Sequence, residues 1–223
     1  RESIIYALGL GFSADPMDEG QLNFTFEERD FQAVPTMAAV LCTPGFWVRD
    51  PESGVDWQKV LHGEQSIELH RPLPPAATIK ARTRVTDIID KGEGKGALLF
   101  VERTLVDEAT DESLATLKST TFARGNGGFG GPSGPQPAPH PLPQREPDAV
   151  CDLPTLPQAA LIYRLSGDPN PLHADPEVAK AAGFKAPILH GLCTLGVAGH
   201  AILKTYCDYD SSRFKSLKLR FSS

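Results

Sequence analysis

Asp168, Asn170 and His173 place an acid, an amide and an imidazole within six residues of one another. Side chains of these kinds can together hold a water molecule and move its protons, which is the chemistry of general acid–base catalysis. Pro169 and Pro171 fix their own φ angles and push the residues before them out of the helical region, so this turn is stiff. A stiff turn suits a site in which the geometry of the reacting groups sets the rate. The segment is therefore a candidate catalytic loop.

Each of these three residues also has an ordinary structural explanation. Asp168 and Asn170 are common turn formers, and His173 suits a cap of the helix expected after it. Their occurrence together in one stiff turn favours a catalytic site over three independent structural roles.

The elements after the loop are predicted to hold it in place. Asp175 suits a helix N-cap, Pro176 the first helical position and Gly183 the position just past the end, so a short helix is expected between them. The next segment, 187–203, is apolar on nearly every side and is typical of a buried central helix. It is shorter than the about 20 apolar residues that a membrane-spanning helix needs, so no membrane span is expected.

Gly191 lies where this buried helix is expected to begin. The first backbone N–H groups of a helix have no partner within it and lie at the positive end of its dipole, so they can stabilise a developing oxyanion. A glycine there would let a substrate carbonyl approach these groups closely. The alternative is a glycine kept only for close helix packing, and spacing alone leaves both explanations open.

The motifs of the chain resemble those of a known enzyme family. The sequence YRLSGDPNPLHADP at 163–176, followed by PILHGLCTLG at 187–196, resembles the signature of the MaoC-like, type 2 enoyl-CoA hydratases. The segments 62–74, 90–94 and 127–131 also stand in the family's order, so the resemblance covers essentially the whole chain. It implies an α+β double hot-dog fold, in which two antiparallel sheets each wrap around a long central helix. It also implies (R)-specific hydration of trans-2-enoyl-CoA to (3R)-3-hydroxyacyl-CoA in fatty acid metabolism, without a metal or redox cofactor.

The resemblance implies roles for individual residues. In such hydratases the Asp and His of the G-D-x-N-P-x-H motif hold the catalytic water, which implies these roles for Asp168 and His173 and an orienting role for Asn170. The glycine of the H-G pair that opens the central helix donates its N–H to the thioester oxygen, and here that glycine is Gly191. The sequence does not decide which member of the acid–imidazole pair is the base, because a coupled pair shares its titration. The positions implied to contact the substrate or its CoA ester are His62, Gly63, Lys91, Pro169, Pro171, Leu172 and Phe221.

The chain is predicted to divide into two hot-dog halves. The segment 125–147 is dominated by glycine and proline and is typical of a linker, so the halves are expected at 1–124 and 148–223. Only the second half carries the Asp-x-Asn-x-x-His set, which suggests that it performs the chemistry while the first shapes the acyl tunnel and contacts CoA. Beside the family pattern the second half looks truncated, and further strands are expected beyond Ser223. Without them the sheet would have an exposed edge.

β-Branched and alternating residues predict the strands. A helix is expected to begin at Pro35 and run to Leu41, ahead of the strands of the first half, and a Gly-rich hairpin turn is expected at 91–96. The predicted strands are 65–69, 78–89, 97–107 and 114–124 in the first half and 160–166 and 216–221 in the second.

Composition narrows the partners and the compartment. The 223 residues, 40% of them hydrophobic, suffice for a buried core. A net charge of −6 without a block of basic residues argues against nucleic acid as the partner. The family resemblance implies an acyl-CoA thioester instead. The chain has no signal-like segment at its N-terminus, so it is expected in the cytoplasm of a bacterium or in the peroxisome of a eukaryote. The cysteines have no C-x-x-C spacing, so neither a zinc site nor a disulfide framework is expected from Cys42, Cys151, Cys193 and Cys207.

Two other functions are compatible with parts of the pattern. A hot-dog thioesterase or a carrier-protein dehydratase would use a similar acid and helix N-terminus on an acyl thioester, but the Asp-x-Asn-x-x-His set favours hydration. A non-catalytic acyl-CoA binding module would hold the ligand without turnover, and the intact Asp168 and His173 argue against it. The sequence decides neither the acyl chain length, nor the pathway, nor the oligomeric state. An exposed sheet edge and the family pattern favour a homodimer or a tight pseudo-dimer.

Overall fold

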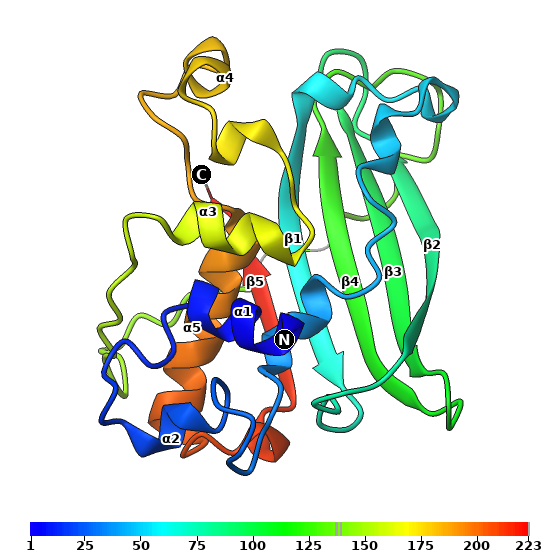
Figure 1. Ribbon diagram of the computed structural model, residues 1–223. Helices are drawn as coiled ribbons and strands as arrows, with labels where there is room; N and C mark the ends of the chain where they lie inside the picture. The colour runs from blue at the N-terminus through cyan, green and yellow to red at the C-terminus, as the bar shows by residue number, and fades with distance from the viewer. Residues whose placement is uncertain (137, 139, 223) are drawn as a thin grey trace.

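An antiparallel sheet forms the frame of the molecule (Figure 1). The computed structural model describes residues 1–136, 138 and 140–222. Within them the strands lie side by side in the order β2-β3-β4-β1-β5, so β5 joins the C-terminal part of the chain to strands from the N-terminal part. The strands are β1 (Val60–Leu69), β2 (Ile79–Asp90), β3 (Ala97–Asp107), β4 (Ser113–Ala123) and β5 (Ser216–Arg220).

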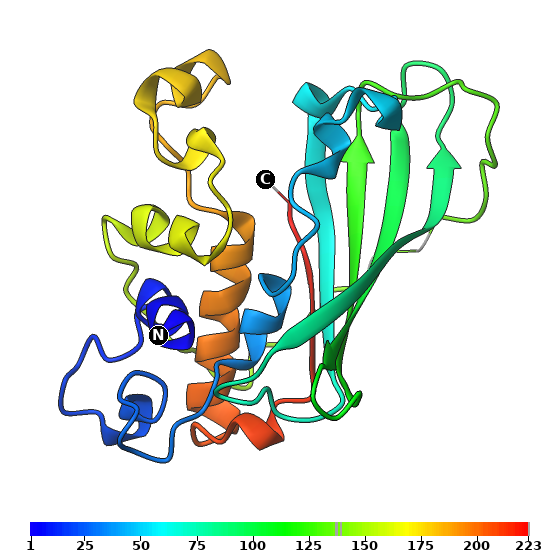
Figure 2. The ribbon, with the colours of Figure 1, turned by 45° about the vertical axis from the view of Figure 1, so that its right-hand side comes forward.

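The α-helices gather on one side of this sheet (Figure 2). The longest of those described is α5, which runs beside β5. No helix among the described residues has both the length and the apolar character to cross a membrane. The α-helices are α1 (Glu2–Gly9), α2 (Glu19–Leu22), α3 (Ala159–Tyr163), α4 (Pro176–Ala181) and α5 (Gly191–Tyr206). Short 3₁₀ helices span Pro35–Ala39, Trp47–Arg49, Pro51–Ser53, Trp57–Lys59, Arg164–Ser166, Pro171–His173 and Ser211–Arg213.

Most of the predicted elements are confirmed. The strand predicted at 97–107 has the observed bounds of β3, and those at 78–89, 114–124 and 216–221 differ from the observed strands by one residue at each end or less. The strand predicted at 65–69 is the end of the longer β1. The cap prediction for α4 is also confirmed, because the Asp175 carboxylate accepts a hydrogen bond from the Glu177 N–H at 2.8 Å and Gly183 has φ +90°.

Two predicted elements differ from the structure. The strand predicted at 160–166 is wrong, since this segment forms α3 and a 3₁₀ turn. The buried residues of α3, Ala159 and Tyr163, are four apart and form one helical face, on which Tyr163 packs against Tyr6 with ring centroids 5.8 Å apart. The helix predicted at 35–41 is a 3₁₀ helix that ends at Ala39, ahead of a residue with positive φ, Cys42, and of Pro44.

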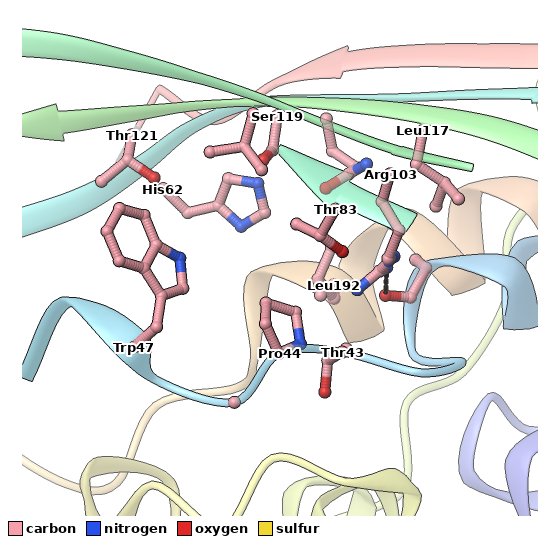
Figure 3. A pocket seen from close by; sticks show the side chains of 14 residues that line it. Thr43, Pro44, Trp47, His62, Thr83, Arg103, Leu117, Ser119, Thr121 and Leu192 are labelled. Atoms are coloured by element: carbon pink, nitrogen blue, oxygen red, sulfur yellow. Dashed lines mark hydrogen bonds between the residues drawn. The ribbon is translucent and has the colours of Figure 1, made fainter. Parts of the chain in front are cut away.

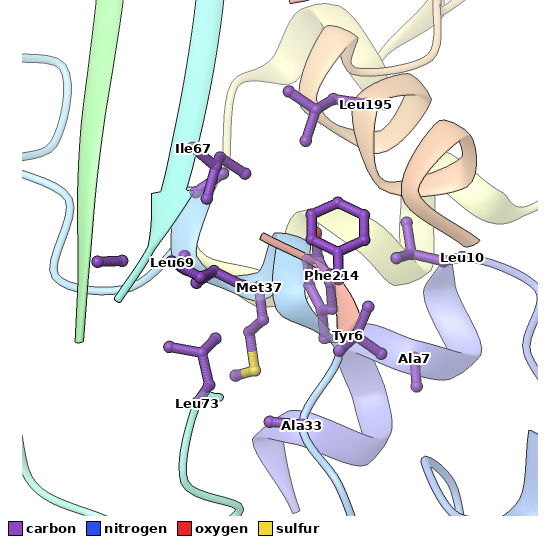
Figure 4. Close-up of a cluster of buried hydrophobic side chains, with 14 of the residues drawn as sticks. Tyr6, Ala7, Leu10, Ala33, Met37, Ile67, Leu69, Leu73, Leu195 and Phe214 are labelled. Atoms are coloured by element: carbon purple, nitrogen blue, oxygen red, sulfur yellow. The ribbon is translucent and has the colours of Figure 1, made fainter. Parts of the chain in front are cut away.

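The main hydrophobic core fills the space between α5, α1 and the sheet (Figure 4). Tyr6 of α1 and Leu10, the C-cap residue of that helix, meet Leu195 of α5 there, together with Ile67 of β1. The glycines of α5 permit this approach, because a Cβ at Gly196 would collide with Leu10. The prediction of a buried central helix with close neighbours is therefore confirmed.

The Gly-rich segment after β4 folds back onto the β2–β3 hairpin. The Asp90 carboxylate, at the end of β2, accepts hydrogen bonds from the N–H groups of Gly92 at 2.8 Å, Gly128 at 2.8 Å and Gly130 at 2.9 Å. These bonds lower the pKa of Asp90, and the bond from Gly128 has the largest effect. The start of the predicted linker 125–147 is thus tied to the sheet, while its residues 137 and 139 lie outside the described residues. The four cysteines are free thiols.

His200 of α5 is expected to make the fold sensitive to acid. Its side chain is 1% exposed and stacks on Phe12 with ring centroids 3.7 Å apart. Burial lowers its pKa from 6.5 to about 4, so the unfolded chain takes up the proton first as the pH falls. The free energy of unfolding should hold above about pH 7 and fall by about 2 kcal/mol between pH 7.5 and 4.5 on account of this group.

Urea unfolding of the wild type and of His200→Gln at both pH values would measure this effect. The variant should lose less stability than the wild type on acidification, whatever its stability at neutral pH. An equal loss in the two proteins would show that His200 does not cause the acid sensitivity.

Candidate active site

The loop predicted to be catalytic is held by its own hydrogen bonds. Asp168 Oδ1 accepts from the Asn170 N–H at 3.2 Å, and Asn170 Oδ1 accepts from the Leu172 N–H at 3.1 Å. Pro171 is the first residue of the 3₁₀ helix Pro171–His173, where its missing N–H costs nothing. The turn-forming roles of Asp168 and Asn170 are therefore real. They leave Asp168 Oδ2 without a bond inside the loop.

His173 has a defined tautomer, and its second ring nitrogen has no hydrogen-bond partner among the residues that the structure describes. Its Nδ1 lies 2.8 Å from the backbone oxygen of Ile188, which can only accept, so Nδ1 carries the proton. A neutral ring then has its lone pair on Nε2, which makes Nε2 the basic atom. The side chain is 9% exposed, so it is buried but still reached from outside.

His190 completes the cluster and is not among the site residues predicted from the sequence. It is 1% exposed, its ring stacks on that of His173 with centroids 3.7 Å apart, and its Nε2 lies 3.3 Å from the backbone oxygen of Asp168. Burial is the main cause that lowers the pKa of His190, and the neighbouring His173 lowers it further, so the neutral ring is favoured. Its position directly before Gly191 in the H-G pair was the available signal.

Side-chain atoms of Asp168, His173 and His190 lie within 4.8 Å of one another. One oxygen and two imidazole nitrogens at this spacing can hold a polarised water between them. The same donor types also suit a metal ion such as Zn²⁺. The resemblance found in the sequence implies no metal, and the chemistry proposed below requires only protein groups.

Gly191 is the first residue of α5, with His190 as the N-cap. Gly191 is exposed, and its N–H has no acceptor among the residues that the structure describes. A Cβ on Gly191 would lie 3.0 Å from Cε1 of Phe221. The close approach that favours glycine therefore comes from an aromatic ring beside the N–H, and not from a second helix.

Phe221 connects this helix start to the first half of the chain. Its N–H donates to the Gly63 backbone oxygen at 2.9 Å, and its ring centroid lies 4.8 Å from that of His62. The register of β1 against β4 shifts between His62 and Glu64, so Gly63 sits at a β-bulge. The structure thus brings His62, Gly63, Phe221 and Gly191 together, and their contacts with substrate stay predictions.

Family models match both parts of the chain. The model described as the MFE-2 hydratase 2 N-terminal domain matches residues 1–125, and the model described as a MaoC-like domain matches residues 139–223. The chain belongs to the MaoC-like hydratase 2 family. Its fold is the α+β double hot-dog fold of these proteins, as the sequence predicts.

Similar proteins come from bacteria and from eukaryotes. The chain is 43% identical to the 3-hydroxyacyl-thioester dehydratase Y of Mycobacterium tuberculosis, over 100% of this chain and 76% of that protein. It is 40% identical to the peroxisomal enoyl-CoA hydratase 2 of Arabidopsis thaliana, over 99% of this chain and 76% of that protein. The solved structure of a MaoC-like dehydratase from Phytophthora capsici superimposes with a TM-score of 0.85 at 40% identity and covers 100% of this chain and 77% of that one.

A pocket of about 180 Å³ in this hydratase 2 family member adjoins the start of α5, where Leu192 lines it (Figure 3). It lies between the sheet and the segment 39–47, with His62 and Leu192 on its wall. His62 contacts Phe221, and Leu192 follows Gly191 directly. A chain bound with its reacting end at Gly191 would therefore find this pocket next to it.

The remaining residues predicted to contact the substrate are not members of the Asp168–His173–His190 cluster. Lys91 lies in the β2–β3 turn, where its Nζ is 4.9 Å from the centre of the Phe122 ring, and it is not part of the cluster. Pro169 and Pro171 are exposed on the loop, and Leu172 is half-buried there. Their contacts with substrate stay predictions.

Proposed function

We propose that the protein is a hydro-lyase that hydrates trans-2-enoyl-CoA to (3R)-3-hydroxyacyl-CoA in fatty acid metabolism. The observation that carries the proposal is the meeting of Asp168 and His173 beside the first N–H of α5, at Gly191. An acid–base pair next to an oxyanion site is the arrangement that addition of water to an α,β-unsaturated thioester requires. The names of the relatives, enoyl-CoA hydratase 2 in one case and 3-hydroxyacyl-thioester dehydratase in another, describe the two directions of this reaction.

The reaction is a syn addition of water. Asp168 and His173 hold the water, and Asn170 keeps the loop that carries them in place through its bond to the Leu172 N–H. The water oxygen forms a bond to C3 as the C2–C3 π bond breaks, and the pair returns a proton to C2. The thioester oxygen gains negative charge meanwhile, and the Gly191 N–H stabilises it. No cofactor enters these steps, and CoA is part of the substrate.

The two halves of the chain divide this work. Residues 148–223 supply the catalytic groups, residues 1–124 supply the pocket and the His62–Gly63 contact with the CoA ester, and 125–147 link them. Phe221 supports this division, because its ring lies against the ring of His62 and also close to the backbone of Gly191. The other proposed contacts with the substrate or CoA are Lys91, Pro169, Pro171 and Leu172.

The direct test follows the enoyl-thioester absorbance of trans-2-enoyl-CoA mixed with the full-length protein. A coupled dehydrogenase specific for (3R)- or (3S)-3-hydroxyacyl-CoA reports the configuration of the product. Loss of absorbance that couples only to the (3R) enzyme supports the proposal. Release of free CoA thiol would instead identify a thioesterase, and binding without either signal would identify an acyl-CoA binding module.

Replacing Gly191 by alanine is expected to lower kcat/KM by at least ~10-fold. The new methyl group would press on Phe221, 3.0 Å away, and stand beside the N–H that binds the thioester oxygen. This N–H remains, so the loss should be smaller than the ~10²–10³-fold seen when an oxyanion donor is removed. Thr194→Ala, on an exposed position of the first turn of the same helix, is the matched control. Equal activity of the two variants would contradict the oxyanion role of Gly191.

We further infer that the protein forms a homodimer. We also infer that it is located in the cytoplasm if it comes from a bacterium and in the peroxisome if it comes from a eukaryote. Light scattering of the full-length protein after size-exclusion chromatography measures the assembly. A mass of one chain at micromolar concentration would contradict the dimer.

A further inference from the structure

An arginine occupies a position of β3 where alternation predicts an apolar residue. Leu99 and Leu105 of this strand are buried, at 4% and 0% exposed, and the positions between them on the same face are Val101 and Arg103. The other face of the strand is the charged one, since Glu102 there pairs with Arg84. Arg103 therefore points inward, into the pocket of Figure 3.

The Arg103 guanidinium is only partly satisfied inside the protein. One terminal nitrogen donates to the Ala39 backbone oxygen at 2.6 Å, whereas the buried Nε has no partner among the described residues. No carboxylate within the described part of the chain forms an ion pair with it. Burial lowers its pKa, yet a guanidinium keeps its proton at any physiological pH. A buried charge without a counter-charge is costly, so an anionic ligand would be stabilised here.

The surroundings of Arg103 are also unusually polar for an acyl pocket. Thr83 pairs directly with Arg103 across the sheet, and Ser119 and Thr121 line the same wall from β4. These hydroxyls can each donate a hydrogen bond to an anion. The volume of about 180 Å³ is several times the about 30 Å³ that one water occupies in the liquid, so the pocket has room for a short polar chain.

The pocket lies where the acyl chain must go. The thioester oxygen is placed at Gly191, the next residue Leu192 lines the pocket, and His62 lines it from the opposite element. The end of a short acyl chain that begins at Gly191 therefore lies within the polar part of the pocket.

From this geometry we propose that the preferred substrates are short enoyl-CoA thioesters whose acyl chain ends in a carboxylate, which Arg103 binds. The inference rests on the proposed hydratase function and specifies its substrate class. A guanidinium fork matches a carboxylate with two parallel hydrogen bonds, which a methyl end cannot accept. Arg103 is thus a specificity-determining residue and takes no part in the proton transfers.

The test compares two substrates of equal length, trans-2-hexenoyl-CoA and its analogue with a terminal carboxylate, 5-carboxy-trans-2-pentenoyl-CoA. For the wild type, kcat/KM should be at least ~10-fold higher for the carboxylate substrate, the usual scale of hydrogen bonds to a charged group. In Arg103→Leu this preference should disappear, because kcat/KM should fall more for the carboxylate substrate than for hexenoyl-CoA. Arg103→Lys keeps the charge without the fork and should keep a reduced preference, which covers the case in which the leucine variant does not fold.

Arg84→Leu is the matched control, because Arg84 lies on the neighbouring strand but with a 73% exposed side chain on the opposite face. It should leave the substrate preference unchanged. Hydration of hexenoyl-CoA as fast as of its carboxylate analogue by the wild type would overturn the inference and leave the hydratase function intact. Equal losses for both substrates in Arg103→Leu and Arg103→Lys would also overturn it, since they would show that Arg103 only braces Ala39. Hydration of neither substrate, nor of longer enoyl-CoA, would refute the hydratase function itself.

Discussion

Replacing Asp168 by asparagine is expected to lower kcat for enoyl-CoA hydration by at least ~10²-fold, with a much smaller change in KM. The amide keeps the shape of the side chain and can still accept the Asn170 N–H bond, so the turn is preserved. It cannot take a proton from the water held with His173. Loss of a general acid or base costs about 10²–10⁴-fold, and it falls on kcat because the proton moves only in the transition state.

Asp175→Asn is a control of the same chemical type in the same loop region. Asp175 also bonds a backbone N–H, that of Glu177, and its replacement removes the same charge, but it lies outside the cluster. Its kcat should stay within about 2-fold of the wild type. Circular dichroism would confirm that both variants are folded. A folded Asp168→Asn protein with near-normal kcat would exclude Asp168 from the chemistry.

The part of the site that the sequence predicts is the part built by local interactions. The turn bonds of Asp168 and Asn170, the cap at Asp175 and the helix start at Gly191 each depend on residues two or three positions away. Turn and capping preferences act at this range, so the residue types already specify them. Because the loop is followed along the chain by the glycine that opens α5, the sequence also predicts where the oxyanion would be bound.

His190 was missed because its contribution is tertiary. Its stacking on His173 and its contact with Asp168 join positions 17 and 22 residues apart, and no local preference encodes them. The strand predicted at 160–166 is wrong for a related reason. A short apolar run suits a buried strand or a buried helix equally, and its packing on Tyr6 of α1 decides for the helix.

Alternation predicts the strands of the sheet, but it does not explain the charged residue Arg103 on the inner face of β3. Alternation gives the bounds of β3 correctly, because one face of the strand packs against the core. The same alternation assigns Arg103 to the inner face, where only the pocket explains a charge. A departure from the pattern at one position thus indicates function more directly than the pattern itself.

Replacing His173 by asparagine or by glutamine is expected to lower kcat by at least ~10²-fold in both variants. The two amides differ in what they keep. The shorter asparagine places its N–H₂ near the position of Nδ1 and can donate to Ile188, whereas glutamine places its amide near Nε2 and gives up that 2.8 Å bond. Neither amide is basic, so neither can replace the free Nε2 of the imidazole.

Stability and activity should therefore separate in this pair. His173→Asn should be close to the wild type in its free energy of unfolding, while His173→Gln should lose about 1 kcal/mol, the usual net value of a hydrogen bond. If His173 served only to tie the loop to Ile188, the asparagine variant would keep its activity and the glutamine variant would lose it. Equal, large losses of kcat in two proteins of unequal stability would instead place Nε2 of His173 in the transfer of protons from the water.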